Sequence, residues 1–281
     1  MKIHEYWSRG SAAVERDGRS WKVVCFGASD ESAEDAVRAA EEAAKRAARA
    51  IRAGEARDGY AYAERPLREE LVEELEHAGE RTAAITRNSY GSLVLNTESG
   101  MFVDIDYPPR GSFSALRRAC GRLFGRQVPS RDERIRTRVR DVVGSTPGLG
   151  LRLYRTANGY RCLVTSRAYD PASREARELL ERFGCDPLYI LLCQAQECFR
   201  ARLSPKFWRC GAPRPPFRFP WLDGERERLY REWQARYKEC TRSFRTCSFV
   251  ETVGSTKVLE SLERIVRVHD RSACDGNGPL A

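Results

Sequence analysis

The chain has 281 residues, of which 41% are hydrophobic and 32% are charged, so it can bury a substantial core in one large domain or two small ones. No run approaches the roughly 20 apolar residues of a membrane helix, and the first residues lack the apolar segment of a signal peptide. We therefore expect a cytoplasmic protein without a membrane partner, in which the ten cysteines are free thiols rather than disulfides.

Charge is divided unevenly along the chain. Residues 1–100 contain 15 Lys and Arg against 19 Asp and Glu, a net charge of −4, whereas the other 181 residues contain 34 against 21 and carry +13. Arginine supplies 43 of the 49 basic residues, and its planar guanidinium suits phosphate groups. The asymmetry favours an anionic partner for the C-terminal two thirds, while the excess of arginine over lysine also fits a GC-rich genome.

Residues 1–80 predict a small α/β accessory module. Residues 21–26 are apolar enough for a short strand, and the alanine-rich run 33–53, begun by Ser32, predicts a helix. Residues 66–79 predict a second helix, because three leucines recur at helical spacing beside glutamates that indicate a solvated face.

Residues 81–281 predict an α+β domain. A β-meander is expected over 83–86, 92–95 and 101–106, and the Asn-Gly turn near residue 158 predicts a hairpin. The remaining expected elements are hairpin strands over 151–155 and 160–165, helices over 113–124, 172–183, 187–199 and 225–240, and a last strand over 264–268.

The strongest local signal for chemistry is the strand that contains Asp104 and Asp106. Alternate residues of a strand point the same way, so both carboxylates share one face while Val103 and Ile105 take the other. Two adjacent like charges favour a divalent cation, Mg²⁺ or Mn²⁺, between them. The alternative is that both aspartates face water or cap the turn before Pro108.

Two further segments favour phosphate or nucleic-acid contacts. Arg161 is expected on a hairpin strand, from which an arginine makes a bidentate phosphate contact or is simply exposed. Residues 198–209 interleave basic and aromatic residues, as in surfaces that stack bases and neutralise phosphates, although an ordinary basic loop has the same composition. Residues 110–140 carry a net charge of +8, and the arginines expected to contact nucleic acid there are Arg131, Arg134 and Arg138.

The cysteines do not predict a zinc site. Of the paired C-x₂₋₄-C spacings that are typical of zinc ligands, Cys193 and Cys198 come close, but we expect them inside a helix, where side chains five residues apart diverge. No pairing of cysteine with His4, His77 or His269 is visible in the sequence either, which disfavours a cysteine nucleophile.

The order of the motifs resembles the archaeo-eukaryotic primase, or primase-polymerase, superfamily. The resemblance covers residues 82 to 281 and lies in the Asp104-Ile-Asp106 strand, the hairpin with Gly159-Tyr-Arg161, the basic segment, and a late hydrophobic stretch that ends at Asp270. It implies an RRM-like antiparallel palm sheet flanked by helices.

The resemblance also implies roles for individual residues. Asp104, Asp106 and Asp270 would bind the metal ions, and Arg161 stands where the family usually has a histidine that contacts the nucleotide phosphates. Arginine holds a triphosphate but cannot take a proton. The other positions that match nucleotide-contacting residues are Arg200, Arg202 and Lys206.

We therefore expect a metal-dependent nucleotidyltransferase that adds nucleotides to a nucleic-acid 3′ end, with nucleic acid and nucleoside triphosphates as partners and Mg²⁺ or Mn²⁺ as cofactor. Two other classes stay open. One is a non-catalytic nucleic-acid-binding protein on a degenerate palm, and the other is a metal-dependent nuclease, which needs the carboxylates but no triphosphate site.

Overall fold

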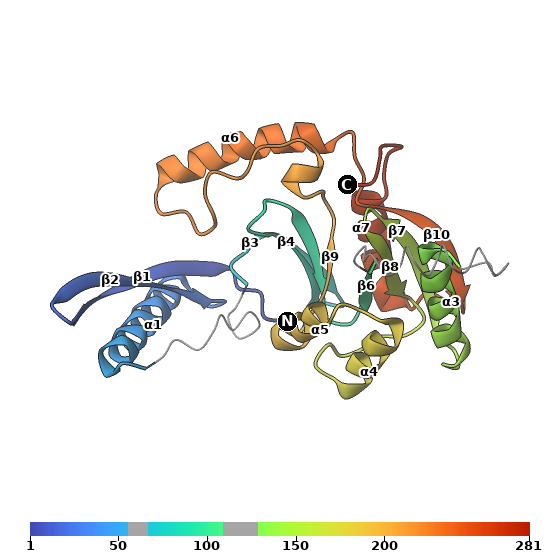
Figure 1. Cartoon of the computed structure of the whole chain (residues 1–281), viewed down its shortest axis with the longest axis horizontal. Helices are drawn as coiled ribbons and strands as arrows, with labels where there is room; N and C mark the ends of the chain where they lie inside the picture. Colours follow the sequence, from blue (N-terminus) through green and yellow to red (C-terminus); the bar gives the residue numbers. More distant parts are fainter. Residues whose placement is uncertain (56–66, 109–128) are drawn as a thin grey trace, which may run out of the picture.

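The computed structural model of the chain describes residues 1–55, 67–108 and 129–281 (Figure 1). These residues form antiparallel sheets flanked by helices, which confirms the expected α+β class. The helix expected over 113–124 lies outside the described residues. Among the described helices, none combines the length and the apolar character that crossing a membrane requires.

A hairpin covered by one helix forms the N-terminal unit, which projects from the rest of the chain (Figure 1). Strands β1 (Tyr6–Arg16) and β2 (Arg19–Ser29) pair along their whole length. Helix α1 (Ala33–Ala53) begins at Ser32, whose hydroxyl accepts a hydrogen bond from the Asp35 N–H. The sequence predicted α1 and part of β2, but not β1.

Small residues let α1 lie directly on the hairpin. Its buried face is a row of alanines, and a Cβ added at Gly27 of β2 would lie 2.2 Å from the Ala40 backbone nitrogen. The helix and the hairpin therefore meet backbone to backbone, and larger residues are excluded from the contact.

The second sheet has the strand order β3-β4-β5-β9. Its members are β3 (Glu70–His77), β4 (Glu80–Arg87), β5 (Leu93–Thr97) and β9 (Phe199–Arg202). Strands β4 and β5 agree with the first two strands of the predicted meander, but the third, over 101–106, belongs to another sheet. Strand β9 takes its place beside β5, where loop and the end of a helix were expected.

The predicted helix over 66–79 is wrong, because β3 occupies most of this range. A spacing of four residues keeps side chains on one face in a strand as well as in a helix, so the leucine pattern does not separate the two. The turn that follows identifies a strand. Ala78 and Gly79 both have positive φ, 53° and 81°, which is the backbone conformation of a tight hairpin. Because β3 and β4 pair across residue 80, the expected domain boundary there would divide a hairpin.

The third sheet has the order β10-β7-β8-β6 and carries most of the predicted site. Its members are β6 (Phe102–Asp106), β7 (Gly150–Thr156), β8 (Gly159–Val164) and β10 (Cys247–Gly254). Strand β6 and the β7–β8 hairpin match the prediction, and β10 was missed. The palm strands thus lie in two sheets instead of one.

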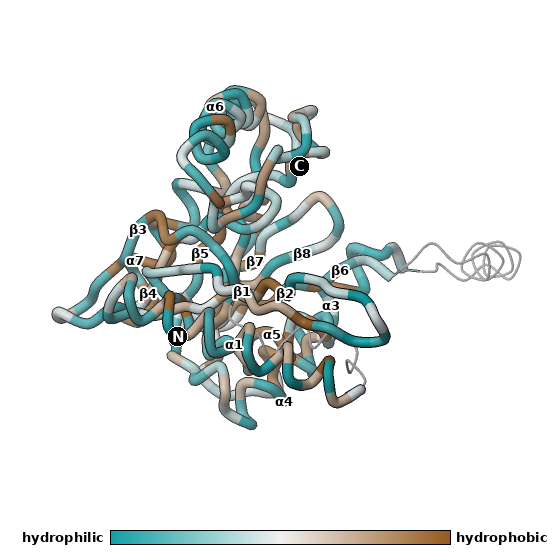
Figure 2. Tube along the Cα trace, turned by 90° about the vertical axis from the view of Figure 1, so that its left-hand side faces the viewer, coloured by the Kyte–Doolittle hydropathy of each residue, from teal (hydrophilic) through white to brown (hydrophobic). Residues whose placement is uncertain are grey.

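Helices cover both faces of this sheet. Helices α3 (Arg131–Gly144) and α4 (Arg174–Phe183) lie on the face of Val103 and Ile105, and α7 (Glu260–Ala273) lies on the face of Asp104. Helix α5 (Pro187–Gln196) leads into β9, and a short 3₁₀ turn (Phe207–Arg209) comes after β9. Helix α6 (Gly224–Thr241) lies above the β3 sheet and is predominantly hydrophilic (Figures 1 and 2).

The predicted strand over 264–268 is wrong, because α7 contains it. Its β-branched residues favour a strand locally. However, Leu262, Ile265, His269 and Ala273 are all buried at helical spacing against the sheet, and this packing overrides the local preference.

We predict that Gly27→Ala separates α1 from the β1–β2 hairpin, because the new Cβ would overlap the α1 backbone. Overpacking of this kind costs about 1–3 kcal/mol. Hydrogen–deuterium exchange should show faster exchange in residues 6–53 and unchanged exchange in the β7–β8 hairpin. Gly144→Ala is the control, since its added Cβ meets no atom within 4 Å. Wild-type exchange in Gly27→Ala would contradict the packing described for α1.

Candidate active site

The candidate site lies where the edge strands of the two four-stranded sheets meet. Strand β6 ends one sheet and β9 ends the other, and side chains join their backbones. The Tyr189 hydroxyl lies 3.1 Å from the Phe102 carbonyl oxygen and 2.9 Å from the Arg200 carbonyl oxygen. Arg161 donates from Nη1 to the Arg202 carbonyl oxygen at 2.9 Å. These contacts bring residues 104–106 beside residues 202–206.

Asp104 and Asp106 share one face of β6, as the alternation predicts, and Asp104 lies directly opposite Arg161 of β8. Gly159 allows this pairing at the hairpin turn, because a Cβ there would lie 2.0 Å from the Ile105 carbonyl oxygen. Asn158 Nδ2 donates to Asp106 Oδ1 at 3.1 Å. The two carboxylates therefore project from the end of a strand whose position is fixed.

The electrostatics of this pair suit a cation. Burial raises the pKa of Asp106, the neighbouring charge of Asp104 raises it further, and Asp186 adds to the effect. Ionising Asp106 therefore costs free energy that a bound cation would recover. Carboxylate oxygens are the ligands that Mg²⁺ and Mn²⁺ prefer, so the donor set fits either ion.

Cations gather on the opposite side of the junction. Burial lowers the pKa of Arg202 to about 10, and the charge of Arg161 contributes. Burial, together with the charges of Arg202 and Arg209, lowers the pKa of Lys206. Protonating these groups is costly where they lie, which is the condition that a bound anion relieves.

Arg202 and Lys206 are not neutralised by ion pairs within the described residues. The Nε atom of Arg202 is buried and has no hydrogen-bond partner there either. Buried donors are normally paired, so this nitrogen marks a place where an acceptor is missing. Two carboxylates that favour a cation thus lie beside cations that favour an anion.

Arg161 is a buried neighbour of this site and contacts it through the backbone of Arg202. It is only 3% exposed, and its Nη1 lies 3.4 Å from His269 Nε2 in addition to its bond to the Arg202 carbonyl. Its guanidinium therefore positions Arg202 and contributes positive charge, and it does not present a bidentate surface to solvent.

Arg200 lies outside the site, contrary to its expected role. Its Nη2 lies 2.7 and 2.9 Å from the two carboxylate oxygens of Glu69, and both side chains are buried. Arg200 and Arg202 are alternate residues of one strand, but the ion pair directs Arg200 toward the beginning of β3. This ion pair joins β9 to the residue before β3, while Arg200 Nη1, like Arg202 Nε, has no hydrogen-bond partner among the described residues.

Asp270 does not join Asp104 and Asp106 as a ligand. It lies on α7, where the Tyr154 hydroxyl donates to Oδ1 at 2.7 Å and Arg152 donates to Oδ2 at 2.8 Å. Tyr154, Arg161 and Asp104 are adjacent positions on three neighbouring strands, so Asp270 is on the correct face but beyond Arg161. In the described part of the chain, one group of three His, Cys, Asp or Glu has ligand atoms mutually within 4.8 Å, and none of the three aspartates belongs to it.

The predicted nucleic-acid arginines lie on α3, on the other face of the sheet. Arg134 and Arg138 are exposed and four residues apart, and Arg131 is the first residue of the helix. Arg138 also packs over Gly184. These residues form a basic surface that is separate from the junction, and nucleic-acid binding there stays a prediction.

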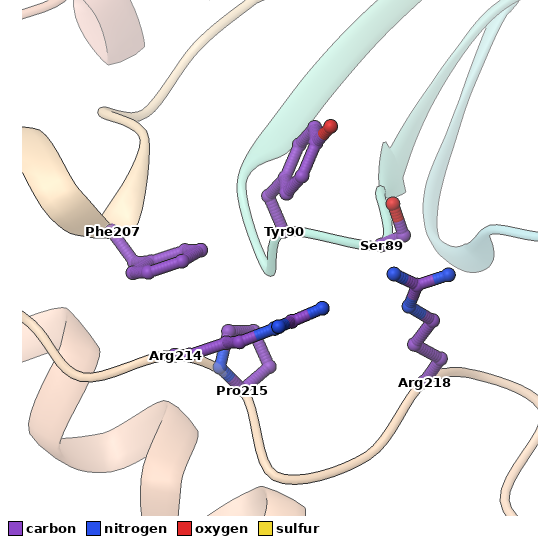
Figure 3. Close-up of a pocket in the computed structure, with 6 residues that line it drawn as sticks. All are labelled: Ser89, Tyr90, Phe207, Arg214, Pro215 and Arg218. Carbon is purple, nitrogen blue, oxygen red and sulfur yellow. The ribbon is translucent and has the colours of Figure 1, made fainter.

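A small pocket lies beside the segment that contains Lys206 (Figure 3). It encloses about 150 Å³ and is lined by Ser89, Tyr90, Phe207, Arg214, Pro215 and Arg218. The exposed Trp208 ring contacts Tyr90 edge to face at 5.3 Å, and Lys206 Nζ lies 5.2 Å from the Trp208 centroid. The basic and aromatic alternation of residues 198–209 thus meets a basic and aromatic pocket.

Sequence reasoning missed several residues of this region. Asp186 caps α5 and approaches Asp106 through space, but its only local signal is an Asp-Pro helix start. Tyr90, Arg214 and Arg218 come from loops far apart in the chain, and no periodic pattern marks them.

We predict that Asp106→Asn raises the melting temperature by a few degrees near pH 7. The folded-state pKa of Asp106 is raised above its ordinary 3.8, so wild type loses stability relative to the variant as pH rises from 3.8 through the folded-state value. The advantage should disappear below pH 3.8 and shrink when Mn²⁺ is added.

Differential scanning fluorimetry across this pH range, with the exposed Glu73→Gln as control, measures the effect. An Asp106→Asn advantage that is absent at neutral pH, or that is unaffected by pH, would contradict the carboxylate repulsion.

Comparison of the chain with protein-family models, with curated proteins and with solved structures gives no match. The resemblance to the primase-polymerase superfamily thus rests on the sequence motifs.

Proposed function

We propose that this chain is a metal-dependent nucleotidyltransferase of the primase-polymerase type, which adds nucleotides to the 3′ end of a nucleic acid. The observation that carries the proposal is the junction itself. Asp104 and Asp106 lie beside Arg202 and Lys206, and their mutual attraction does not offset burial and like-charge repulsion, because the pKa of Asp106 stays raised and the pKa values of Arg202 and Lys206 stay lowered. A divalent cation together with a triphosphate would satisfy both.

The residue types suit phosphoryl transfer. This reaction depends on positioning and charge stabilisation more than on proton transfer by side chains, so arginine in place of histidine at residue 161 is compatible with it. Asp104 and Asp106 would hold Mg²⁺ or Mn²⁺, which would neutralise charge on the phosphates. Arg202 and Lys206 would bind phosphate oxygens, and Arg161 would keep Arg202 in position.

The surroundings of the junction favour nucleic acid as the acceptor. The pocket beside Lys206 combines aromatic rings with Arg214 and Arg218, which matches surfaces that stack bases and neutralise a single strand. The exposed arginines of α3 add a second basic surface, and the net charge of +13 beyond residue 100 strengthens attraction to phosphates.

One observation favours a second candidate, a nucleic-acid-binding protein without turnover. Asp270, which the resemblance implies as the third metal ligand, is bound by Arg152 and Tyr154 instead. A site with two carboxylates binds metal and phosphate but holds them less rigidly. A nuclease would use the same carboxylates, but it gives no reason why Arg202 and Lys206 form no ion pair within residues 1–55, 67–108 and 129–281.

We predict that Asp104→Asn lowers nucleotide incorporation by at least about a hundredfold, because it removes charge from the metal site. The assay uses labelled nucleoside and deoxynucleoside triphosphates, Mg²⁺ or Mn²⁺, and primed or single-stranded template. Binding of the template, measured by fluorescence anisotropy, should be unchanged, since the basic surfaces remain.

Asp275→Asn, an exposed change outside the junction, is the matched control and should keep wild-type activity. If wild-type protein binds template but incorporates no nucleotide with either metal, the nucleotidyltransferase proposal is wrong and the non-catalytic nucleic-acid-binding protein is favoured.

We also predict that Lys206→Ala raises the KM for the nucleoside triphosphate about tenfold or more, with a smaller effect on kcat. Loss of one charge-assisted hydrogen bond costs about 1.5–3 kcal/mol, which corresponds to this range. Lys238→Ala on the exposed face of α6 is the control. Equal KM values for the two variants would remove Lys206 from the triphosphate site.

A further inference from the structure

A cluster of two cysteines and one histidine lies between β10 and α7, separate from the carboxylate pair. Cys247 begins β10, His269 lies in α7, and Cys274 follows the last residue of that helix. The Sγ atoms of Cys247 and Cys274 are 3.4 Å apart, and Cys247 Sγ is 3.8 Å from His269 Nε2. All three ligand atoms lie within 4.8 Å of one another.

These separations are those of a metal coordination shell. Ligands at about 2.3 Å (sulfur) and about 2.1 Å (nitrogen) from a tetrahedral zinc ion lie about 3.8 Å (S–S) and about 3.6 Å (S–N) apart. The observed distances are within a few tenths of an ångström of these values. The third separation, between Cys274 and His269, is at most 4.8 Å, so a single ion would draw these two atoms together by no more than about 1.2 Å.

The histidine is oriented for coordination. Its Nδ1 lies 3.1 Å from Asp270 Oδ1, and Asp270 is itself fixed by Tyr154 and Arg152. A histidine that donates from Nδ1 to a carboxylate has its lone pair on Nε2, which lies 3.8 Å from Cys247 Sγ and 3.4 Å from Arg161 Nη1. Carboxylates hold metal-binding histidines in this way. Asp270 would therefore orient His269, although it is not a ligand beside Asp104.

We propose that Cys247, His269 and Cys274 bind one zinc ion, with Asp270 orienting the histidine. Thiolate and imidazole ligands select zinc over Mg²⁺ and Mn²⁺, so this site and the carboxylate pair take different metals. No fourth His, Cys, Asp or Glu of the described residues belongs to the group, so a water molecule completes the shell. Cys274 is partly exposed and gives solvent access.

The ion would connect the ends of the sheet and the helix. Cys247 is on an outer strand and the other ligands are on α7, so binding would hold α7 against the face that carries Tyr154 and Arg161. His269 Nε2 now lies 3.4 Å from Arg161 Nη1. Metal binding would take this lone pair and leave Arg161 bound to the Arg202 carbonyl alone.

Titration of the full chain with Co²⁺ tests the proposal. The protein is stripped of metal and kept reduced, and the absorbance of thiolate-bound, tetrahedral cobalt is followed. We expect saturation at one equivalent per chain, proton release on binding, and loss of the signal when Zn²⁺ displaces Co²⁺. Purified protein should also contain close to one zinc per chain by mass spectrometry.

Variants locate the ligands. Cys247→Ser and Cys274→Ser should each weaken binding at least tenfold, whereas Cys210→Ser, which alters a buried cysteine in another cluster, should bind normally. Asp104→Asn should keep the cobalt signal, which separates this site from the proposed nucleotidyl transfer. Absence of a thiolate–cobalt band in reduced wild-type protein would overturn the proposal even if the serine variants do not fold. A band that persists in both serine variants would overturn it as well.

Discussion

The junction between β6 and β9 is the constraint on which the candidate site depends. Both are edge strands, and the backbone groups on the open side of an edge strand need partners. The Tyr189 hydroxyl donates to the Phe102 carbonyl and accepts from the Arg200 N–H, and Arg161 donates to the Arg202 carbonyl. Each such bond adds only about 1 kcal/mol, but an unpaired buried group would cost about 1–3 kcal/mol. Side-chain hydrogen bonds thus join two sheets and bring together residues that lie about a hundred positions apart.

The charges collected at this junction oppose stability. The pKa of Asp106 is raised while those of Arg202 and Lys206 are lowered, so each group is strained in its charged form. Elsewhere the chain resolves such strain, as Glu69 does for Arg200 and as Tyr154 does for Asp270. Perturbed groups that stay unresolved are concentrated at functional sites. Within one sheet edge, Arg200 forms an ion pair with Glu69 whereas Arg202 forms none with any described residue, and this contrast is the reason to place the ligand at Arg202.

Local signals in the sequence account for much of the fold. Ser32 and the alanine run specify α1, the Asn-Gly turn specifies the β7–β8 hairpin, and alternation places Asp104 and Asp106 on one face. The errors arise where one pattern fits two structures. Leucines four residues apart suit β3 as well as a helix. The β-branched run within α7 suits a strand locally, and only the burial of residues at helical spacing identifies the helix.

Contacts between distant elements account for the rest. The sequence places Arg200 and Arg202 together, and only the position of Glu69 separates their roles. The resemblance to the primase-polymerase superfamily implies that Asp270 is a metal ligand, whereas the structure surrounds this residue with Arg152, Tyr154 and His269. Cys247 approaches His269 because β10 pairs with β7 beneath α7, and no spacing along the chain encodes that approach.

The most direct test of the junction is a crystal structure with Mn²⁺ and a non-hydrolysable nucleoside triphosphate, in which anomalous scattering locates the manganese. We expect manganese bound by Asp104 and Asp106 and phosphate oxygens within hydrogen-bond distance of Arg202 and Lys206. Manganese bound elsewhere, or a triphosphate that contacts neither Arg202 nor Lys206, would contradict it.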